Sequence, residues 1–121
     1  MIGIGTDLVD VDRFRASLAR TPSLAQRVFT DGERADAAER PDPAERLAAR
    51  FAAKEAVMKA LGVGLGAFAL RDVEVVLADS GQPSLSLSGA AAELAAERGV
   101  TRWLVTMSHT GHLAQAVAVA L

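Results

Sequence analysis

One segment places four charged side chains in a helix that is otherwise almost entirely apolar. Residues 50–60 read Arg-Phe-Ala-Ala-Lys-Glu-Ala-Val-Met-Lys-Ala. At about 100° per residue, Phe51, Glu55 and Lys59 follow one side of this helix. We therefore expect Glu55 to lie near the core. A carboxylate there needs a cation, a hydrogen-bond donor or a metal, because an uncompensated buried charge is destabilising.

Three of these charges also have simpler interpretations. Glu55 and Lys59 are four residues apart, so they are also compatible with an ordinary surface ion pair worth about 0.2–0.5 kcal/mol. Lys54 projects about 60° from Phe51, on the side away from Glu55, and a purely structural role suits it equally well. Other segments are needed to choose between these interpretations.

The chain opens with an alternating pattern typical of a strand, residues 2–9. Asp7 shares one face of this strand with Gly3 and Gly5. Glycines inside a strand indicate a place where a ligand or another backbone comes close. Asp7 is therefore a candidate site residue, and the alternative is that it caps the helix that follows.

A second polar cluster follows a predicted strand near the end of the chain. Residues 103–112 read Trp-Leu-Val-Thr-Met-Ser-His-Thr-Gly-His, so the strand leads into a glycine-bearing turn. A lone histidine at a strand end is more often structural than functional. The group Ser108, His109 and Thr110 is suggestive of a site but not specific to one.

Three motifs occur together in this order: Gly5-x-Asp7 followed by Arg13, residues 50–60, and Ser108-His109-Thr110. Together they resemble the holo-acyl-carrier-protein synthase family, the bacterial 4′-phosphopantetheinyl transferases. The resemblance extends over residues 1–121 and includes two intervening motifs, Val28-Phe29-Thr30-x-x-Glu33 and Gly81-x-Pro83.

The composition agrees with one small domain, residues 1–121. Half of the residues are apolar, but no run approaches the about 18 residues needed to span a bilayer, and no leader pattern is present, so we expect a cytoplasmic protein without membrane contact. A net charge of −2 argues against a nucleic-acid partner. The chain has no cysteine, so a metal site must use oxygen or imidazole ligands, and carboxylates favour Mg²⁺.

Periodicity and turn signals predict an α+β fold with a long central helix packed against an antiparallel sheet, as in the 4′-phosphopantetheinyl transferase fold. Strands are expected at residues 2–9, 73–77, 84–88, 101–107 and 113–120. Helices are expected from residue 11 to residue 20, after Pro22, after Thr30, from Asp42 to Gly62, and over residues 90–98. The glycine-rich turn of residues 62–66 is suited to a close approach of backbone to a phosphate.

The resemblance implies an enzyme that transfers 4′-phosphopantetheine from coenzyme A to a serine of apo acyl carrier protein, releasing 3′,5′-ADP, in fatty acid biosynthesis. It implies that Asp7 and Glu55 hold Mg²⁺ and act with Lys59, which steadies the reacting phosphate. Arg50 and His109 are expected at anionic groups of the nucleotide, such as its 3′-phosphate. The complete set expected to bind coenzyme A is Arg50, Lys59, Gly62, Gly64, His109 and Thr110.

The resemblance also implies partners. Arg13 and Arg20, seven residues apart on one helical side, are expected to dock the carrier protein, whereas the alternative is a solvated face. A homotrimer is expected, with coenzyme A between subunits.

The motifs are compatible with more than one catalytic base and with more than one function. A metal-bound water, a carboxylate or Lys59 would each serve as the base, and Thr110 stands where some relatives carry an acidic residue. A binding module without turnover, or the same chemistry on a polyketide or peptide synthase carrier, are the competing hypotheses.

Overall fold

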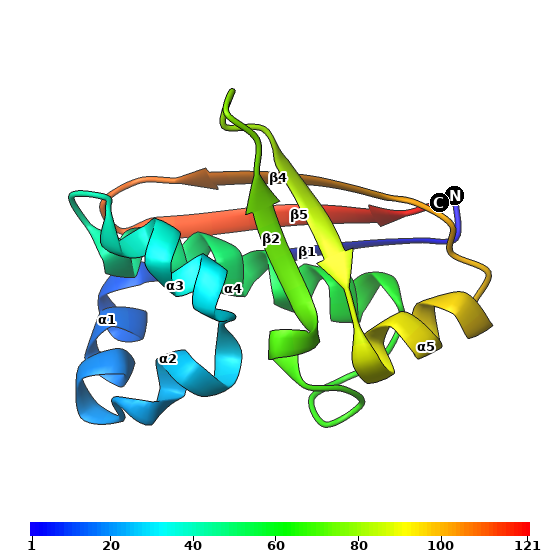
Figure 1. Cartoon of the computed structure of the whole chain (residues 1–121), viewed down its shortest axis with the longest axis horizontal. Coiled ribbons are helices and arrows are strands. Elements are labelled where there is room, and N and C mark those ends of the chain that lie inside the picture. Colours follow the sequence, from blue (N-terminus) through cyan, green and yellow to red (C-terminus); the bar gives the residue numbers. More distant parts are fainter.

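The centre of the molecule is the long helix α4 (Pro43–Ala60), around which the rest of the chain is arranged. The computed structural model describes all residues, 1–121. In chain order the other elements are β1 (Gly3–Asp10), α1 (Val11–Arg20), α2 (Ser23–Val28), α3 (Asp31–Ala38), the 3₁₀ turn η1 (Leu70–Asp72), β2 (Val73–Leu77), β3 (Pro83–Leu87), α5 (Gly89–Glu97), β4 (Trp103–His109) and β5 (Leu113–Ala120) (Figure 1). The predicted α+β class is confirmed.

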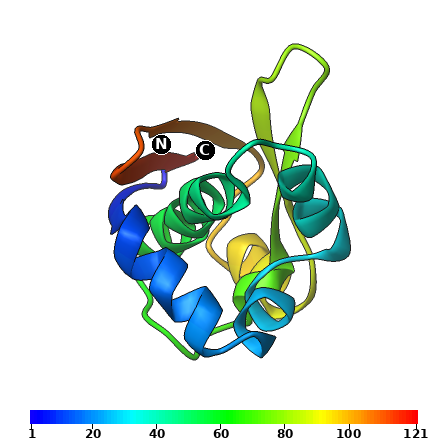
Figure 2. The ribbon, with the colours of Figure 1, turned by 90° about the vertical axis from the view of Figure 1, so that its left-hand side faces the viewer.

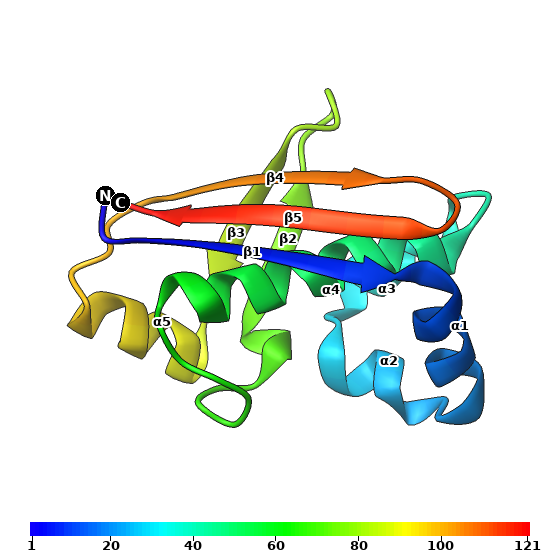
Figure 3. The ribbon, with the colours of Figure 1, turned by 180° about the vertical axis from the view of Figure 1, so that it is seen from behind.

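The strands form two antiparallel ladders, where the sequence predicted one sheet. One has the order β1-β5-β4, and the other is the hairpin β2-β3. Strand β5 pairs with both neighbours, so that Ala116 lies opposite Asp7 on one side and Met107 on the other. The hairpin packs beside β4 without a main-chain ladder and projects beyond the sheet (Figures 1 and 3). The alternation of side chains does not specify which strands join, which is why this division was missed.

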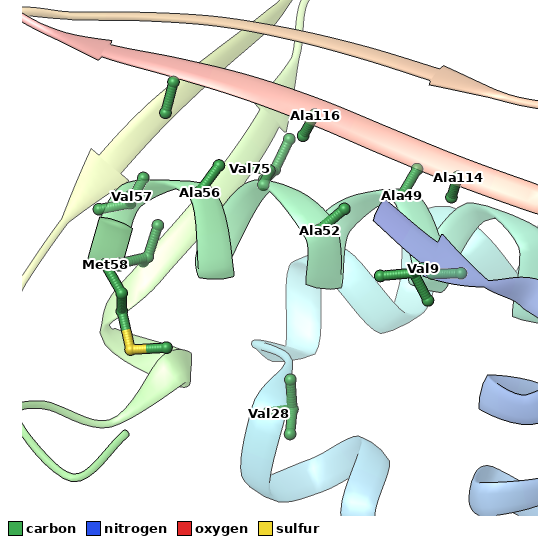
Figure 4. Packing of buried hydrophobic residues seen from close by; sticks show 14 of the residues in the cluster. Val9, Val28, Ala49, Ala52, Ala56, Val57, Met58, Val75, Ala114 and Ala116 are labelled. Carbon is green, nitrogen blue, oxygen red and sulfur yellow. The ribbon is translucent and has the colours of Figure 1, made fainter. Parts of the chain in front are cut away.

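Helix α4 is buried nearly all round because small side chains line it. Seen along its axis, the three-stranded sheet lies on one side of α4 and the hairpin on another, with α1 and α5 below (Figure 2). Figure 4 shows Ala49, Ala52 and Ala56 pointing toward Ala114 and Ala116 of β5. All five alanines are buried. Alanine against alanine brings the helix and the sheet close together, and it leaves little room for a charged side chain without a partner.

Strand β1 approaches α4 more closely still, through its two glycines. A Cβ atom on Gly5 would clash with the carbonyl oxygen of Ala56 and would lie 2.7 Å from the nitrogen of Ala60, and one on Gly3 would clash with the carbonyl of Ala60. The close approach predicted at these glycines is therefore real, and the approaching group is the backbone of α4. This contact brings Asp7, two residues after Gly5, against the C-terminal half of the helix.

We expect Gly5→Ala to destabilise the chain by about 1–3 kcal/mol or more, because the obstructing atoms belong to backbone and cannot rotate away. Urea denaturation followed by circular dichroism measures the change. Gly64→Ala is the matched control, since a Cβ there meets nothing within 4 Å, and a shift within about 0.5 kcal/mol is expected. Equal stability of the two variants would contradict the close packing.

The predicted helix boundaries are confirmed where capping residues define them. Asp42 is the N-cap of α4, with Pro43 in the first turn, and Thr30 and Glu33 form the capping box of α3. Gly62 ends α4 with φ of +71°, and the N–H groups of Gly62 and Val63 donate to the carbonyls of Lys59 and Met58. This is the Schellman pattern of a helix C-terminus.

Strand β4 differs from its prediction at both ends. It begins at Trp103 rather than residue 101, because the N–H groups of Thr101 and Arg102 donate to the carbonyl of Leu121 outside the ladder. It ends at His109 rather than residue 107, paired with Ala114. Helix α5 and strand β3 each begin one residue earlier than predicted, at Gly89 and Pro83. None of the helices combines the length and the apolar character that crossing a bilayer requires.

Candidate active site

The four charges of residues 50–60 in α4 have very different surroundings. Arg50 forms an ion pair with Asp36, Lys54 with Glu33, and Lys59 with Asp7. The fourth charge, Glu55, has neither an ion-pair nor a hydrogen-bond partner in the chain. The expectation that these charges need partners therefore holds for the three cations and leaves the carboxylate as the exception.

Lys54 is a structural residue at the middle of the fold. Its side chain and that of Glu33 are both fully buried, with Nζ 2.7 Å from Glu33 Oε1. The ammonium also donates to the carbonyls of Leu70 and Val73, while Glu33 accepts from the N–H of Val75. Burial lowers the pKa of Lys54, and the carboxylate of Glu33 partly offsets this. The pair joins α3, α4 and β2.

Asp7 and Lys59 meet across the contact between β1 and α4. Lys59 Nζ lies 3.0 Å from Asp7 Oδ1 and donates to the carbonyl of Thr6 at 2.9 Å. The surface pair between Lys59 and Glu55, the simpler alternative from the sequence, is not formed. The capping role considered for Asp7 is also absent, because Asp10 caps α1 by accepting from the N–H of Arg13.

Glu55 is half-buried beside Asp7. Loss of solvent raises its pKa, and the negative charge of Asp7 raises it further, whereas the nearby charge of Lys59 lowers it. Asp7 and Glu55 line one hollow between β1, α1 and α4, whose other walls include Arg13, Phe14 and Phe51. Two neighbouring carboxylates, of which only Asp7 is paired with an ammonium, favour an additional cation. No group of three or more metal-ligating side chains exists in the chain.

A second hollow lies between α4, β4 and the hairpin, and it is lined by basic side chains. Arg46, Arg50 and His109 face it, together with Gly81 and Pro83 of the hairpin. Arg50 is almost completely buried, and its Nε has no hydrogen-bond partner. These residues include two predicted nucleotide contacts, Arg50 and His109, and the Gly81-x-Pro83 motif.

Sequence reasoning missed two residues at this second hollow. Glu45 forms an ion pair with Nδ1 of His109, and Arg46 lines the wall. Both lie in the first turns of α4, ten and nine residues before Glu55. Arg46 carried a signal in the sequence, because it lies four residues before Arg50 and residues four apart are neighbours on a helix. Glu45 carried none, because its partner His109 lies 64 residues away along the chain.

The two hollows lie on opposite sides of α4. Arg50 and Glu55 project about 140° apart around the helix, toward the hairpin and toward β1 respectively. The predicted contacts at Gly62 and Gly64 lie past the far end of α4, about 25 Å along the helix axis from Glu45 and therefore from His109. Within one chain the predicted coenzyme A contacts do not come together.

The remaining predicted residues lie at the margins. Thr110 forms the turn between β4 and β5, where its hydroxyl oxygen accepts from the N–H groups of His112 and Leu113. Arg13 lines the hollow of Asp7 and Glu55, whereas Arg20 ends α1 outside it and donates to Ser17. Arg13 is thus the docking candidate that lies beside the carboxylates.

Known proteins match the chain over its whole length. The sequence profile of the 4′-phosphopantetheinyl transferase superfamily matches residues 3–119. A holo-[acyl-carrier-protein] synthase from Frankia casuarinae is 52% identical over 120 residues, which cover 99% of this chain and 97% of the relative. The crystal structure of the synthase from Neisseria meningitidis superposes with a TM-score of 0.90 at 32% identity, covering 100% and 98% of the two chains. That from Helicobacter pylori, in complex with coenzyme A, superposes with a TM-score of 0.85 at 26% identity, covering 98% and 99%.

A shared fold and a full-length sequence match define the class of protein as a 4′-phosphopantetheinyl transferase. Within that superfamily, the chain belongs to the holo-[acyl-carrier-protein] synthase family.

Proposed function

We propose that this chain transfers 4′-phosphopantetheine from coenzyme A to a serine of apo acyl carrier protein, and so supplies holo carrier protein for fatty acid biosynthesis. The observation that carries the proposal is that Asp7 and the unpaired Glu55 line one hollow, with Lys59 paired to Asp7. The names of the matching relatives support the same activity. The proposed catalytic unit is a single domain, residues 1–121, and a cytoplasmic location stays a prediction.

The reaction is a phosphoryl transfer. The serine oxygen of the carrier forms a bond to the phosphorus that bears pantetheine. The bond from that phosphorus to the oxygen bridging the pyrophosphate breaks, and 3′,5′-ADP leaves as the serine hydroxyl loses its proton. Such a step depends on alignment and charge neutralisation more than on covalent chemistry. The Lys59 ammonium, half exposed beside Asp7, is suited to the negative charge that develops on the leaving oxygen.

Asp7 and Glu55 are the residues that would hold Mg²⁺. The fit rests on their chemistry: two carboxylates share a hollow, one of them lacks any partner, and burial together with the charge of Asp7 raises the pKa of Glu55. Mg²⁺ is bound in proteins by one or two carboxylates and completes its shell with water and substrate phosphates. When bound, it supplies neutralisation of the pyrophosphate charge.

The activity is tested directly with purified components. Incubation with apo acyl carrier protein, coenzyme A and Mg²⁺ should add the mass of phosphopantetheine to the carrier serine, and EDTA should stop the addition. Lys59→Ala should slow transfer more than it weakens coenzyme A binding, because its charge acts mainly in the transition state. If the chain binds coenzyme A but adds no mass to the carrier protein, it is a binding module and not an enzyme.

We also propose a homotrimer with coenzyme A between subunits. On the outer face of the three-stranded sheet, which no helix or hairpin of the chain covers (Figure 2), several large apolar side chains are exposed: Ile2, Ile4, Leu8, Leu104 and Leu113. Such a face is typical of an interface. The two hollows lie on opposite sides of α4, so one chain cannot bring them together. A complete site would form where the carboxylates of one subunit lie beside the basic hollow of the next. Analytical ultracentrifugation at the concentration of the activity assay measures the oligomeric state. A fully active chain that is monomeric there would contradict this proposal.

Arg13 is the proposed contact for the acidic carrier protein, with Arg20 extending the same face. We expect Arg13→Glu to raise the apparent KM for carrier protein and to weaken the salt dependence of that KM, with coenzyme A binding little changed. Steady-state kinetics at several salt concentrations, with calorimetry for coenzyme A, measure both effects.

Arg102→Glu is the matched control, since it makes the same charge change on the exposed segment before β4, near the opposite end of the molecule from α1 (Figure 1). It should leave both quantities unchanged. If Arg13→Glu weakens coenzyme A binding as strongly as it raises the carrier KM, Arg13 belongs to the nucleotide site and not to docking.

A further inference from the structure

Of the two histidine contacts in the chain, the one between His109 and Glu45 is the more buried. His109 ends β4 and Glu45 lies in the first turn of α4, and Nδ1 of the imidazole meets Oε1 of the carboxylate. The two side chains are only 25% and 20% exposed. A second histidine pair, His112 with Asp12, is 3.3 Å apart and mostly exposed, which makes it a natural reference.

The contact determines the orientation of the imidazole. An ionised carboxylate has no hydrogen to donate, so the hydrogen bond requires that Nδ1 of His109 carries a proton and donates it to Glu45. Nε2, at the opposite corner of the ring, is then the nitrogen left for another partner. Glu45 is itself held in place, because its N–H donates to the N-cap carboxylate of Asp42.

The hollow that His109 lines has basic groups available for an anion. Arg46 lines it and forms no ion pair in the chain. Arg50 lines it too, but Asp36 neutralises its charge, and its buried Nε lacks a partner. His109 is therefore one of three side chains with nitrogen donors around this hollow, and the carboxylates of Asp36 and Glu45 are already paired with two of them.

We propose that Glu45 is a positioning residue that holds His109 for a phosphomonoester on the nucleotide, and thereby sets the preference for coenzyme A over 3′-dephospho-coenzyme A. The proposal rests on the function proposed above, in which this hollow receives the nucleotide. Glu45 acts through His109 and makes no contact with the phosphate. Without the carboxylate of Glu45, the imidazole is free to rotate and its proton is no longer held on Nδ1. The ring then points its donor at the phosphate for only part of the time.

The test is the ratio of kcat/KM for coenzyme A to that for 3′-dephospho-coenzyme A, both with apo acyl carrier protein and Mg²⁺. We expect Glu45→Gln to lower this ratio about tenfold, because hydrogen bonds to charged groups are stronger than those between neutral groups. The change should appear as a higher KM for coenzyme A, with kcat unchanged. The dephosphorylated substrate should change less than about twofold. Glu45→Asp should restore part of the ratio, and ¹⁵N NMR of the imidazole should show Nδ1 losing its fixed proton in Glu45→Gln.

Asp12→Asn is the matched control, because it removes the carboxylate from the exposed histidine pair and should leave the ratio unchanged. A purely structural role of Glu45 would lower kcat/KM for both substrates equally, and that result would overturn the proposal. The proposal would also fail if Glu45→Gln kept the wild-type ratio while His109→Gln lost the preference for coenzyme A. That result would leave the proposed function intact. If the wild-type chain transfers phosphopantetheine but makes no distinction between the two substrates, the proposal fails while the activity stands.

Discussion

Glu55→Gln should lower turnover by about 10²-fold or more, because it removes one of the two carboxylates proposed to hold Mg²⁺ against the pyrophosphate. Asp7→Asn should have a similar effect. The rate of phosphopantetheine addition in saturating Mg²⁺ measures both. Glu97→Gln, on the exposed side of α5, is the control and should leave the rate unchanged. Near-normal turnover of Glu55→Gln would end the assignment of this site.

Glu55→Gln should also raise the stability of the fold at neutral pH. A variant that is more stable but inactive has lost its function and not its fold. Burial and the charge of Asp7 raise the pKa of Glu55 in the folded chain, so the folded state binds that proton more tightly than the unfolded state does. The ionised side chain therefore lowers stability once the pH exceeds its ordinary value of 4.5. The advantage of Glu55→Gln should grow as pH rises through the raised pKa and vanish below about 4. Thermal unfolding of the metal-free protein across pH 4–8 measures the difference.

Lys54→Met should destabilise the chain by about 3–5 kcal/mol, because it leaves the fully buried carboxylate of Glu33 without its cation. This is a large share of the about 5–15 kcal/mol by which small domains are stable. Urea denaturation measures the loss. The pair holds α3 and β2 on α4, so proteolysis between α3 and β2 should accelerate as well.

Lys59→Met is the matched control for stability, since it is the same change on the same helix at a lysine that is half exposed. A surface ion pair contributes about 0–1 kcal/mol, so this variant should fold almost normally while losing transfer activity. The double variant Glu33→Leu with Lys54→Met should be more stable than the sum of its single changes predicts. A Lys54→Met chain as stable as Lys59→Met would contradict the structural role of Lys54.

The local elements could be predicted from the sequence because each has a short-range cause. The caps at Asp42 and Thr30, the stop at Gly62 and the alternation in β5 act over a few residues, and all four are confirmed. The close approach at Gly5 was also predictable, since only another backbone or a ligand explains glycines at that face. Which strands join was not predictable, because alternation specifies a buried face and not a neighbour.

The partners of the α4 charges depended on the tertiary structure. Sequence spacing suggested an ion pair between Lys59 and Glu55. Because β1 packs against α4, Lys59 pairs instead with Asp7, which is 52 residues away along the chain. The pairing of Glu45 with His109 likewise joins residues 64 apart. No periodicity within either segment carries that information.

By itself, the sequence determined which residue types the site contains and which of them call for partners, because a charge in an apolar helix is destabilising unless it is compensated. The motif resemblance determined the family. Only the tertiary structure decided how those charges pair and that Glu55 is left free. It also decided that the basic hollow lies on the other side of α4 from the carboxylates. The physical reason is that burial and Coulomb interactions depend on distance in space, and distances between segments are fixed by packing rather than by spacing along the chain.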